Sequence, residues 1–142
     1  MRRRRIGSVA TVLTLAAGSV AASATSSSAQ TAHNGACGSG YSVVNQMRVG
    51  SGSGGSGTTY LTYNSGSGYN CVVTIGDYPG TTRWMEAWIE VSGGEWNKDQ
   101  NYYKHYAGPR YVYGRGHCID WAGFESATNN SLITLKFGTN CG

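Results

Sequence analysis

Short stretches of alternating apolar and polar residues, separated by glycine-rich turns, run through most of the chain. Between residues 85 and 91, apolar residues at the odd positions alternate with Glu86, Trp88 and Glu90. This two-residue period predicts a half-buried strand. A short helix is the competing interpretation, because Trp84 and Trp88 are also four residues apart. Similar segments rich in Tyr, Val and Thr predict further strands at 41–49, 58–64, 69–75, 101–106, 110–113, 118–124 and 132–137.

Glycine, serine and proline mark the predicted turns. Residues 65–68 (Ser-Gly-Ser-Gly) predict a hairpin turn, and Pro79-Gly80 predicts a second turn. Gly108-Pro109 and the glycines around Arg115 are expected to separate the later strands. Seven or eight short strands with such spacing predict an all-β domain: a small antiparallel sandwich or barrel.

The first residues have the three-part pattern of a signal peptide. Arg2–Arg5 are followed by an uncharged stretch at 6–20 and then by small residues that allow cleavage after Ala24 or Ala29. The apolar stretch is too short and too interrupted for a comfortable transmembrane anchor, which is the alternative. We favour the general secretory route over twin-arginine export. The sequence therefore predicts a signal peptide at 1–29, a single secreted β domain at 30–142, and a flexible start at 30–36.

Four cysteines follow the leader, at positions 37, 71, 118 and 141. An even number in an exported chain predicts disulfide bonds, and the wide spacing disfavours a metal site. Of the three possible pairings we favour Cys37–Cys71 with Cys118–Cys141, because each closes a local loop. In the chain-entropy model such loops each contribute roughly 3–4 kcal/mol to stability.

The positive charge of the chain belongs to the leader. The sequence has eleven basic and seven acidic residues, and four of the basic residues are Arg2–Arg5. The remaining seven basic residues balance the seven acidic ones. The sequence thus gives no reason to expect nucleic-acid binding, or membrane binding after signal cleavage. It leaves the oligomeric state open.

No catalytic, metal-binding or cofactor-binding residues are predicted. Residues 52–57 match GxGxxG, but a strand rather than a helix is expected to follow, so we interpret them as a loop. His117 and Asp120 lie three apart on one predicted strand and would point to opposite faces. Glu86 and Glu90 share a face but are about 13 Å apart along the strand, too far for a glycosidase pair. A third hypothesis, a small hydrolase, would require His117, Asp120 and Glu125 to lie together at a polar cleft.

Aromatic and basic residues interleave between positions 102 and 115. Such rings can stack on sugars. The interpretation we favour is that these residues belong to amphipathic strands whose tyrosine rings pack while their hydroxyl groups face solvent. The chain has four Trp, ten Tyr and two Phe, more than a core of this size needs. The sequence therefore indicates a tentative binding surface made of Trp88, Tyr103, His105, Arg110, Tyr111 and Tyr113.

Several segments together resemble the spore-associated protein A family of spore-forming actinobacteria. These segments are Cys37 with Tyr41-Ser42-Val43-Val44, Tyr60-Leu61-Thr62-Tyr63-Asn64, Gly68-Tyr69-Asn70-Cys71-Val72-Val73-Thr74, Tyr106-Ala107-Gly108-Pro109, Cys118-Ile119-Asp120-Trp121 and Cys141-Gly142. The chain departs from the family pattern at 83–103, which is richer in Trp and charge, and at the Gly/Ser loop before Thr58. The resemblance implies an exported protein found with spores, without an established enzymatic activity, and supplies no catalytic residues.

We expect a secreted, non-enzymatic protein associated with spore or cell-surface glycans through aromatic side chains. The alternative is a small extracellular binding module, either a glycan binder or an enzyme inhibitor. An inhibitor would present a protruding loop, and the candidates are Tyr78-Pro79-Gly80 and Gly108-Pro109-Arg110.

Overall fold

The computed structural model describes residues 32–50, 56–126 and 133–142. These residues form eight antiparallel strands and the turns that connect them. The strands are β1 (Ser42–Gly50), β2 (Ser56–Asn64), β3 (Tyr69–Gly76), β4 (Arg83–Val91), β5 (Asn97–Tyr103), β6 (Tyr106–Tyr113), β7 (Ile119–Ser126) and β8 (Thr134–Thr139). The predicted signal peptide, most of the Gly/Ser loop and the start of the predicted strand at 132 lie outside the described residues.

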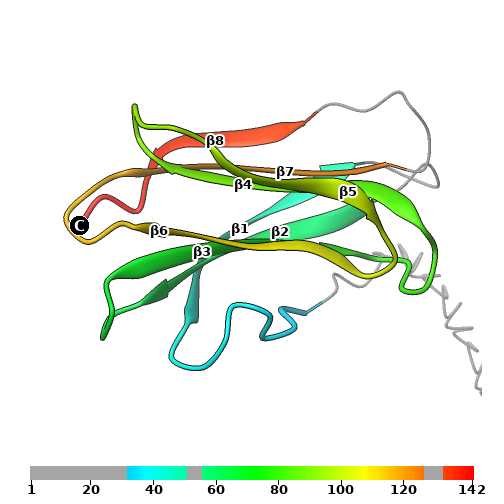
Figure 1. Ribbon diagram of the computed structural model, residues 1–142, viewed down its shortest axis with the longest axis horizontal. Coiled ribbons are helices and arrows are strands. Elements are labelled where there is room, and N and C mark those ends of the chain that lie inside the picture. Colours follow the sequence, from blue (N-terminus) through cyan, green and yellow to red (C-terminus); the bar gives the residue numbers. More distant parts are fainter. Residues whose placement is uncertain (1–31, 51–55, 127–132) are drawn as a thin grey trace, which may run out of the picture.

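The strands form two four-stranded sheets packed face to face (Figure 1). Sheet A has the order β1-β2-β3-β6 and sheet B the order β5-β4-β7-β8. Side chains of the edge strands join the two sheets: Arg110 Nε donates to the Lys98 carbonyl at 2.8 Å, and Lys136 Nζ donates to the Gln46 carbonyl at 3.1 Å. The prediction of a disulfide-stapled antiparallel sandwich is confirmed.

The core between the sheets follows from the two-residue period of the strands. Sheet A contributes Leu61 and Val72, and sheet B contributes Met85, Ile89 and Trp121, all of them buried. The alternation in β4 confirms the strand interpretation of residues 85–91 and rejects the helix.

The centre of the sandwich is polar and very closely packed. Thr59 Oγ1 and Thr74 Oγ1 are 2.8 Å apart, and Thr74 Oγ1 donates to the Glu86 carbonyl at 2.7 Å. Gly123 faces them from β7, and a Cβ atom there would lie 1.6 Å from Thr59 Oγ1. Only glycine allows sheet B to approach sheet A at this point.

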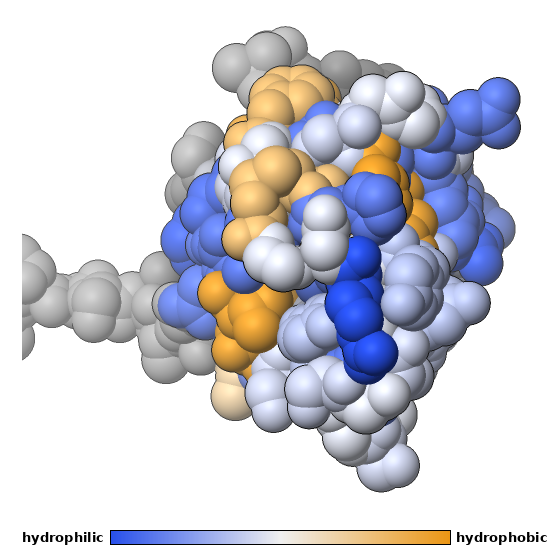
Figure 2. All heavy atoms as spheres, turned by 90° about the vertical axis from the view of Figure 1, so that its left-hand side faces the viewer, coloured by the Kyte–Doolittle hydropathy of each residue, from blue (hydrophilic) through white to orange (hydrophobic). Residues whose placement is uncertain are grey.

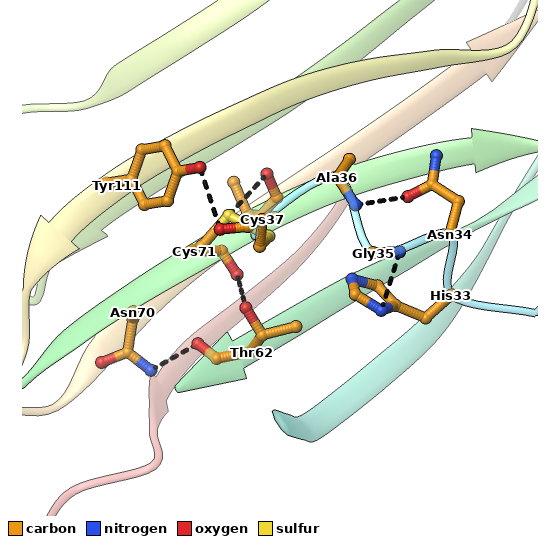
Figure 3. The surroundings of a disulfide bond; sticks show 10 residues. His33, Asn34, Gly35, Ala36, Cys37, Thr62, Asn70, Cys71 and Tyr111 are labelled. Atoms are coloured by element: carbon orange, nitrogen blue, oxygen red, sulfur yellow. Dashed lines mark hydrogen bonds between the residues drawn. A yellow bond between two sulfur atoms is a disulfide. The ribbon is translucent and has the colours of Figure 1, made fainter. Parts of the chain in front are cut away.

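The outer face of sheet A is covered by the segment before β1, seen in cyan beneath the sheet in Figure 1. The predicted pairing is confirmed: Cys37–Cys71 joins this segment to β3, and Cys118–Cys141 joins the chain before β7 to the end of β8. Tyr111 donates its hydroxyl proton to the Cys37 carbonyl at 3.2 Å (Figure 3). Beneath the segment, a second apolar cluster includes Tyr60, Val73 and Ile75.

Two boundaries differ from the sequence-based expectation. Gly108-Pro109 does not separate strands but lies inside β6, with a cis peptide bond. Proline is tolerated there because β6 is the edge strand of sheet A. On the side of β6 that has no neighbouring strand in the sheet, the N–H that proline lacks is not needed for a hydrogen bond between strands. The strand expected at 101–106 begins earlier, at Asn97, and ends at Tyr103, because Asn97–Tyr103 pairs along β4.

We predict that Gly123→Ala destabilises the domain by about 3 kcal/mol, since the added methyl group must push Thr59 and the two sheets apart. Urea unfolding followed by tryptophan fluorescence measures this. Gly142→Ala is the control, because a Cβ atom at that position meets nothing within 4 Å. Equal stability of the two variants would contradict the close approach of the sheets.

Candidate functional site

The outer face of sheet B carries a broad set of aromatic side chains. Even-numbered residues of β4 point outward because the odd-numbered ones fill the core, and the strand register extends this orientation to β5, β7 and β8. Tyr102 and Phe137 are 63% and 65% exposed. We call this surface the aromatic face; it comprises Trp84, Trp88, Trp96, Tyr102, Phe124 and Phe137.

Edge-to-face contacts hold these rings in place. The Trp84 and Tyr102 ring centroids are 5.1 Å apart, and those of Trp88 and Trp96 are 5.9 Å apart. Trp96, just before β5, also lies 6.5 Å from Phe137 of β8, so the two rings meet above the strands between them. Such pairs contribute roughly 0.5–1.5 kcal/mol beyond their buried area, so the rings form a preorganised surface.

Polar groups are interspersed among the rings. Trp84 Nε1 donates to Glu86 Oε1 at 2.6 Å, and Lys98 Nζ lies 4.0 Å from the Trp88 ring centroid. The face therefore combines apolar ring surfaces with hydrogen-bonding groups, which is the combination that sugar recognition requires: flat rings for stacking and polar atoms for hydroxyl and amide groups.

A carboxyl pair lies beneath the rings, where β4 and β7 meet. Glu90 is directly opposite Asp120 in the strand register, and the two are 5% and 6% exposed. Asp120 Oδ1 accepts from Ser92 Oγ at 2.5 Å and from the Gly138 N–H at 2.6 Å. Burial, and then the neighbouring Asp120 carboxylate, raises the pKa of Glu90.

The carboxylates do not form a hydrolytic pair. Glu90 and Asp120 are both almost fully buried beneath the rings, whereas the two carboxyl groups of a glycosidase flank an open cleft. Glu125 points inward from the far end of β7, whereas Asp120 points outward, and His117 is exposed in the turn before β7. The convergence of His117, Asp120 and Glu125 that a hydrolase would need is absent.

The residues of the tentative binding surface are distributed over three places. Trp88 belongs to the aromatic face. Tyr103 and His105 line an open hollow of about 290 Å³ at the β5–β6 turn, and Tyr103 donates its hydroxyl proton to Asp99 at 2.8 Å. Arg110 forms an ion pair with the same carboxylate at the edge between the sheets, at 3.3 Å.

Tyr111 and Tyr113 lie on the opposite side of the molecule from Trp88. Both extend from the outer face of sheet A, where Tyr113 packs against Tyr69 with ring centroids 5.5 Å apart. Tyr111 is tied to the segment that covers this sheet. The structure thus brings Tyr103, His105 and Arg110 near one another, and separates both Trp88 and the two tyrosines from them.

A second hollow, of about 310 Å³, opens at the end of the sandwich seen in Figure 2. It is lined by Val44, Tyr63, Asn70, Gly114, Asn140, Cys141 and Gly142. This lining includes no Asp, Glu or His side chain, and Figure 2 shows hydrophobic residues there in small separate groups among hydrophilic ones. In the described ranges, no three His, Cys, Asp or Glu residues gather in a group fit to ligate a metal ion.

Glu125 lies fully buried between the sheets, at the other end of the sandwich. Its Oε1 is 3.1 Å from Arg83 Nε, and Arg48 pairs with Asp77 nearby. Loss of water around the carboxyl raises the pKa of Glu125 to about 7, and the Arg83 guanidinium limits the rise. These two acid–base pairs therefore place a group of charged side chains at this end of the sandwich.

Comparison with known proteins identifies the family. Spore-associated protein A of Streptomyces coelicolor is 44% identical over 138 residues, which cover 96% of this chain and 81% of that protein. The chain belongs to the spore-associated protein A family. No family model and no solved structure matches the chain. None of the described residues forms a helix with the length and apolarity that a bilayer crossing requires.

The sequence analysis of this spore-associated protein A family member did not identify most residues of the aromatic face. Trp84 was noted only for its spacing from Trp88, and Trp96, Tyr102 and Phe137 were not grouped with it. The usable signal was the even-numbered position of Trp84 and Trp88 on one strand. Grouping the others required the register of β4 with β5 and the position of β8, which the sequence alone does not provide.

We predict that the buried Glu125 makes the domain less stable as pH rises from about 4.5 to 7. The unfolded chain loses this proton near pH 4.5 and the folded domain near pH 7, so the folded state is favoured below that window by about 3 kcal/mol relative to pH above it. Glu90, whose pKa is also raised, acts in the same direction.

Glu125→Gln isolates the effect of Glu125, because glutamine resembles the protonated carboxyl. Its free energy of urea unfolding should match the parent protein near pH 4 and exceed it at pH 8. Glu95→Gln, at an exposed turn position, should follow the parent protein throughout. Parallel pH profiles for the parent and Glu125→Gln proteins would rule out this titration.

Proposed function

We propose that this protein is a secreted, non-enzymatic component of the spore or cell surface that attaches to polysaccharides through the aromatic face of sheet B. The observation that carries the proposal is the continuous row of rings from Trp88 over Trp96 to Phe137, with carboxylates and Lys98 among them. Sugar rings present apolar C–H faces and polar edges, and both find counterparts on this surface.

The size and shape of the aromatic face favour a polymer over a small molecule. Trp84 and Trp88 are four residues apart on β4, about 13 Å along the strand, so more than one sugar unit is contacted at once. The rings project from the outer face of sheet B, whereas peptide strands usually add to a sheet edge through backbone hydrogen bonds. The sheet edges here are bridged by Arg110 and Lys136.

Family membership supports the location. The Streptomyces coelicolor relative is named for its association with spores, and at 44% identity we extend that association to this protein. The leader and the two disulfides fit an oxidising, extracellular setting.

The non-enzymatic part of the proposal is supported by the arrangement of the carboxylates and histidines. Glu90, Asp120 and Glu125 are almost fully buried, and His117 is exposed in the turn before β7. The alternative, an inhibitor of an extracellular enzyme, loses one of its two candidate loops, since Gly108-Pro109-Arg110 lies within β6. Tyr78-Pro79-Gly80 remains as an exposed turn.

The leader gives a direct test of export. Expressed in an actinobacterial host, the protein should be recovered from the culture medium or the spore surface with an N-terminus at Thr25 or Gln30, as read by mass spectrometry. These positions follow cleavage after Ala24 or Ala29. Recovery from cell membranes with Arg2–Arg5 intact would show a retained anchor instead.

Replacement of rings on the aromatic face tests attachment. Purified protein should sediment with spores and isolated cell walls at both low and high salt, because stacking is screened little by ions. Trp84→Ala and Phe137→Ala should each weaken binding by about tenfold, the loss of roughly 1–1.5 kcal/mol of ring contact.

Tyr113→Ala is the control, because it removes an exposed ring from sheet A on the opposite face. It should bind as the parent protein does. Loss of binding in this variant, with Trp84→Ala unaffected, would move the attachment surface to sheet A. Absence of binding by the parent protein to spores, walls and polysaccharides would contradict the proposal as a whole.

A further inference from the structure

Two buried polar atoms within the aromatic face have no hydrogen-bond partner among the described residues. They are the indole Nε1 of Trp88 and Oε2 of Glu90. Glu90 is 95% buried, and both side chains leave β4 on the outer side of sheet B. Buried polar groups in native proteins nearly always have a partner, so two neighbouring exceptions on a candidate binding surface indicate groups that a ligand completes.

The two atoms are complementary in hydrogen bonding. The indole N–H can only donate, and the free Glu90 oxygen accepts. Glu90 lies directly opposite Asp120 in the strand register, and Asp120 in turn accepts from Ser92 Oγ and the Gly138 N–H. Residues two apart on a strand are separated by about 6.6 Å and share a face, so the two side chains are neighbours on the outer side of β4.

A secondary amide fits these requirements better than the other common substituents of sugars. Its carbonyl accepts from the indole and its N–H donates to the carboxyl, on opposite sides of one planar group. A free amine offers only donors and would leave the indole unpaired. A hydroxyl has no apolar part, whereas the rings of Trp96 and Phe137 beside the pair provide an apolar wall for a methyl group.

We infer that the aromatic face recognises polysaccharides whose sugars carry acetamido groups, with Trp88 Nε1 donating to the acetamido carbonyl and Glu90 accepting from its N–H. This inference rests on the proposed polysaccharide-binding function and specifies its ligand class. Access requires movement of the two side chains that lie against the Trp88 ring. Lys98 is exposed on β5, and Trp96 follows a turn that contains Gly93-Gly94.

The test compares two soluble oligosaccharides with the same backbone. Chitotetraose carries an acetamido group on every sugar, and cellotetraose carries a hydroxyl at the same position. Isothermal titration of the purified protein should show about tenfold or greater preference for chitotetraose, because its acetamido group contacts the indole and the carboxyl with separate atoms, whereas the single hydroxyl oxygen of cellotetraose must serve both.

Three variants separate the hydrogen bonds from ring stacking. Trp88→Phe keeps an aromatic ring but removes the N–H, and Glu90→Leu keeps the bulk but removes the acceptor. Each should bring the ratio of the two affinities close to one while retaining binding to cellotetraose. Glu90→Gln should keep the preference, since its N–H₂ can donate to Asp120 and its carbonyl remains free to accept. Near-ultraviolet circular dichroism verifies that each variant is folded.

The outcomes distinguish the inference from the proposed function. Equal affinity of the parent protein for the two oligosaccharides overturns the acetamido inference and leaves polysaccharide binding in place. Binding to neither oligosaccharide and to no cell wall overturns both. A peptide containing acetyl-lysine carries the same amide without a sugar ring, and equally tight binding of that peptide would overturn the assignment to glycans. Trp84→Ala should weaken both oligosaccharides alike, because it lies outside the amide site.

Discussion

The Cys37–Cys71 disulfide decides which surface of this sandwich is open. A sandwich has two inner faces, which bury each other, and two outer faces, which need not be alike. The disulfide ties the segment before β1 onto sheet A, where it buries Tyr60, Val73 and Ile75. The 34-residue loop that it closes contributes roughly 3–4 kcal/mol through chain entropy. Sheet B has no comparable cover in the described ranges, and its outer face is where the aromatic rings gather.

The two sheets pack closely against each other behind the aromatic face. Gly123 lets the two sheets approach closely around Thr59 and Thr74, so β4 and β7 are fixed from within. The rings on the outer side of sheet B pack against each other above these strands. A surface ordered before the ligand arrives loses little conformational entropy on binding, which suits a protein that must hold a polymer without chemistry to assist it.

Much of the fold followed from the sequence, because it depends on local signals. The alternation at 85–91 predicted β4, the glycines at 66 and 68 predicted the β2–β3 hairpin, and the loop lengths favoured the correct disulfide pairs. Gly108-Pro109 misled the prediction because a proline is compatible with an edge strand, and edges are defined only by the sheet order.

The candidate site was less predictable, because it depends on register between distant strands. The approach of Glu90 and Asp120 requires the pairing of β4 with β7, thirty residues apart in sequence. The ring contact from Trp96 to Phe137 requires the position of β8. Periodicity placed Trp88 on an outer face, but it could not show that Tyr111 and Tyr113 lie on the opposite sheet.

The most direct test of the aromatic face is the nuclear magnetic resonance spectrum of the four tryptophan indole N–H groups during titration with a soluble cell-wall oligosaccharide. Trp121 is an internal control, because its Nε1 donates to Thr139 Oγ1 in the interior at 2.9 Å. We expect the Trp84, Trp88 and Trp96 resonances to shift and that of Trp121 to stay in place. Shifts confined to tyrosine resonances of sheet A, with all four indoles unmoved at saturation, would contradict the account.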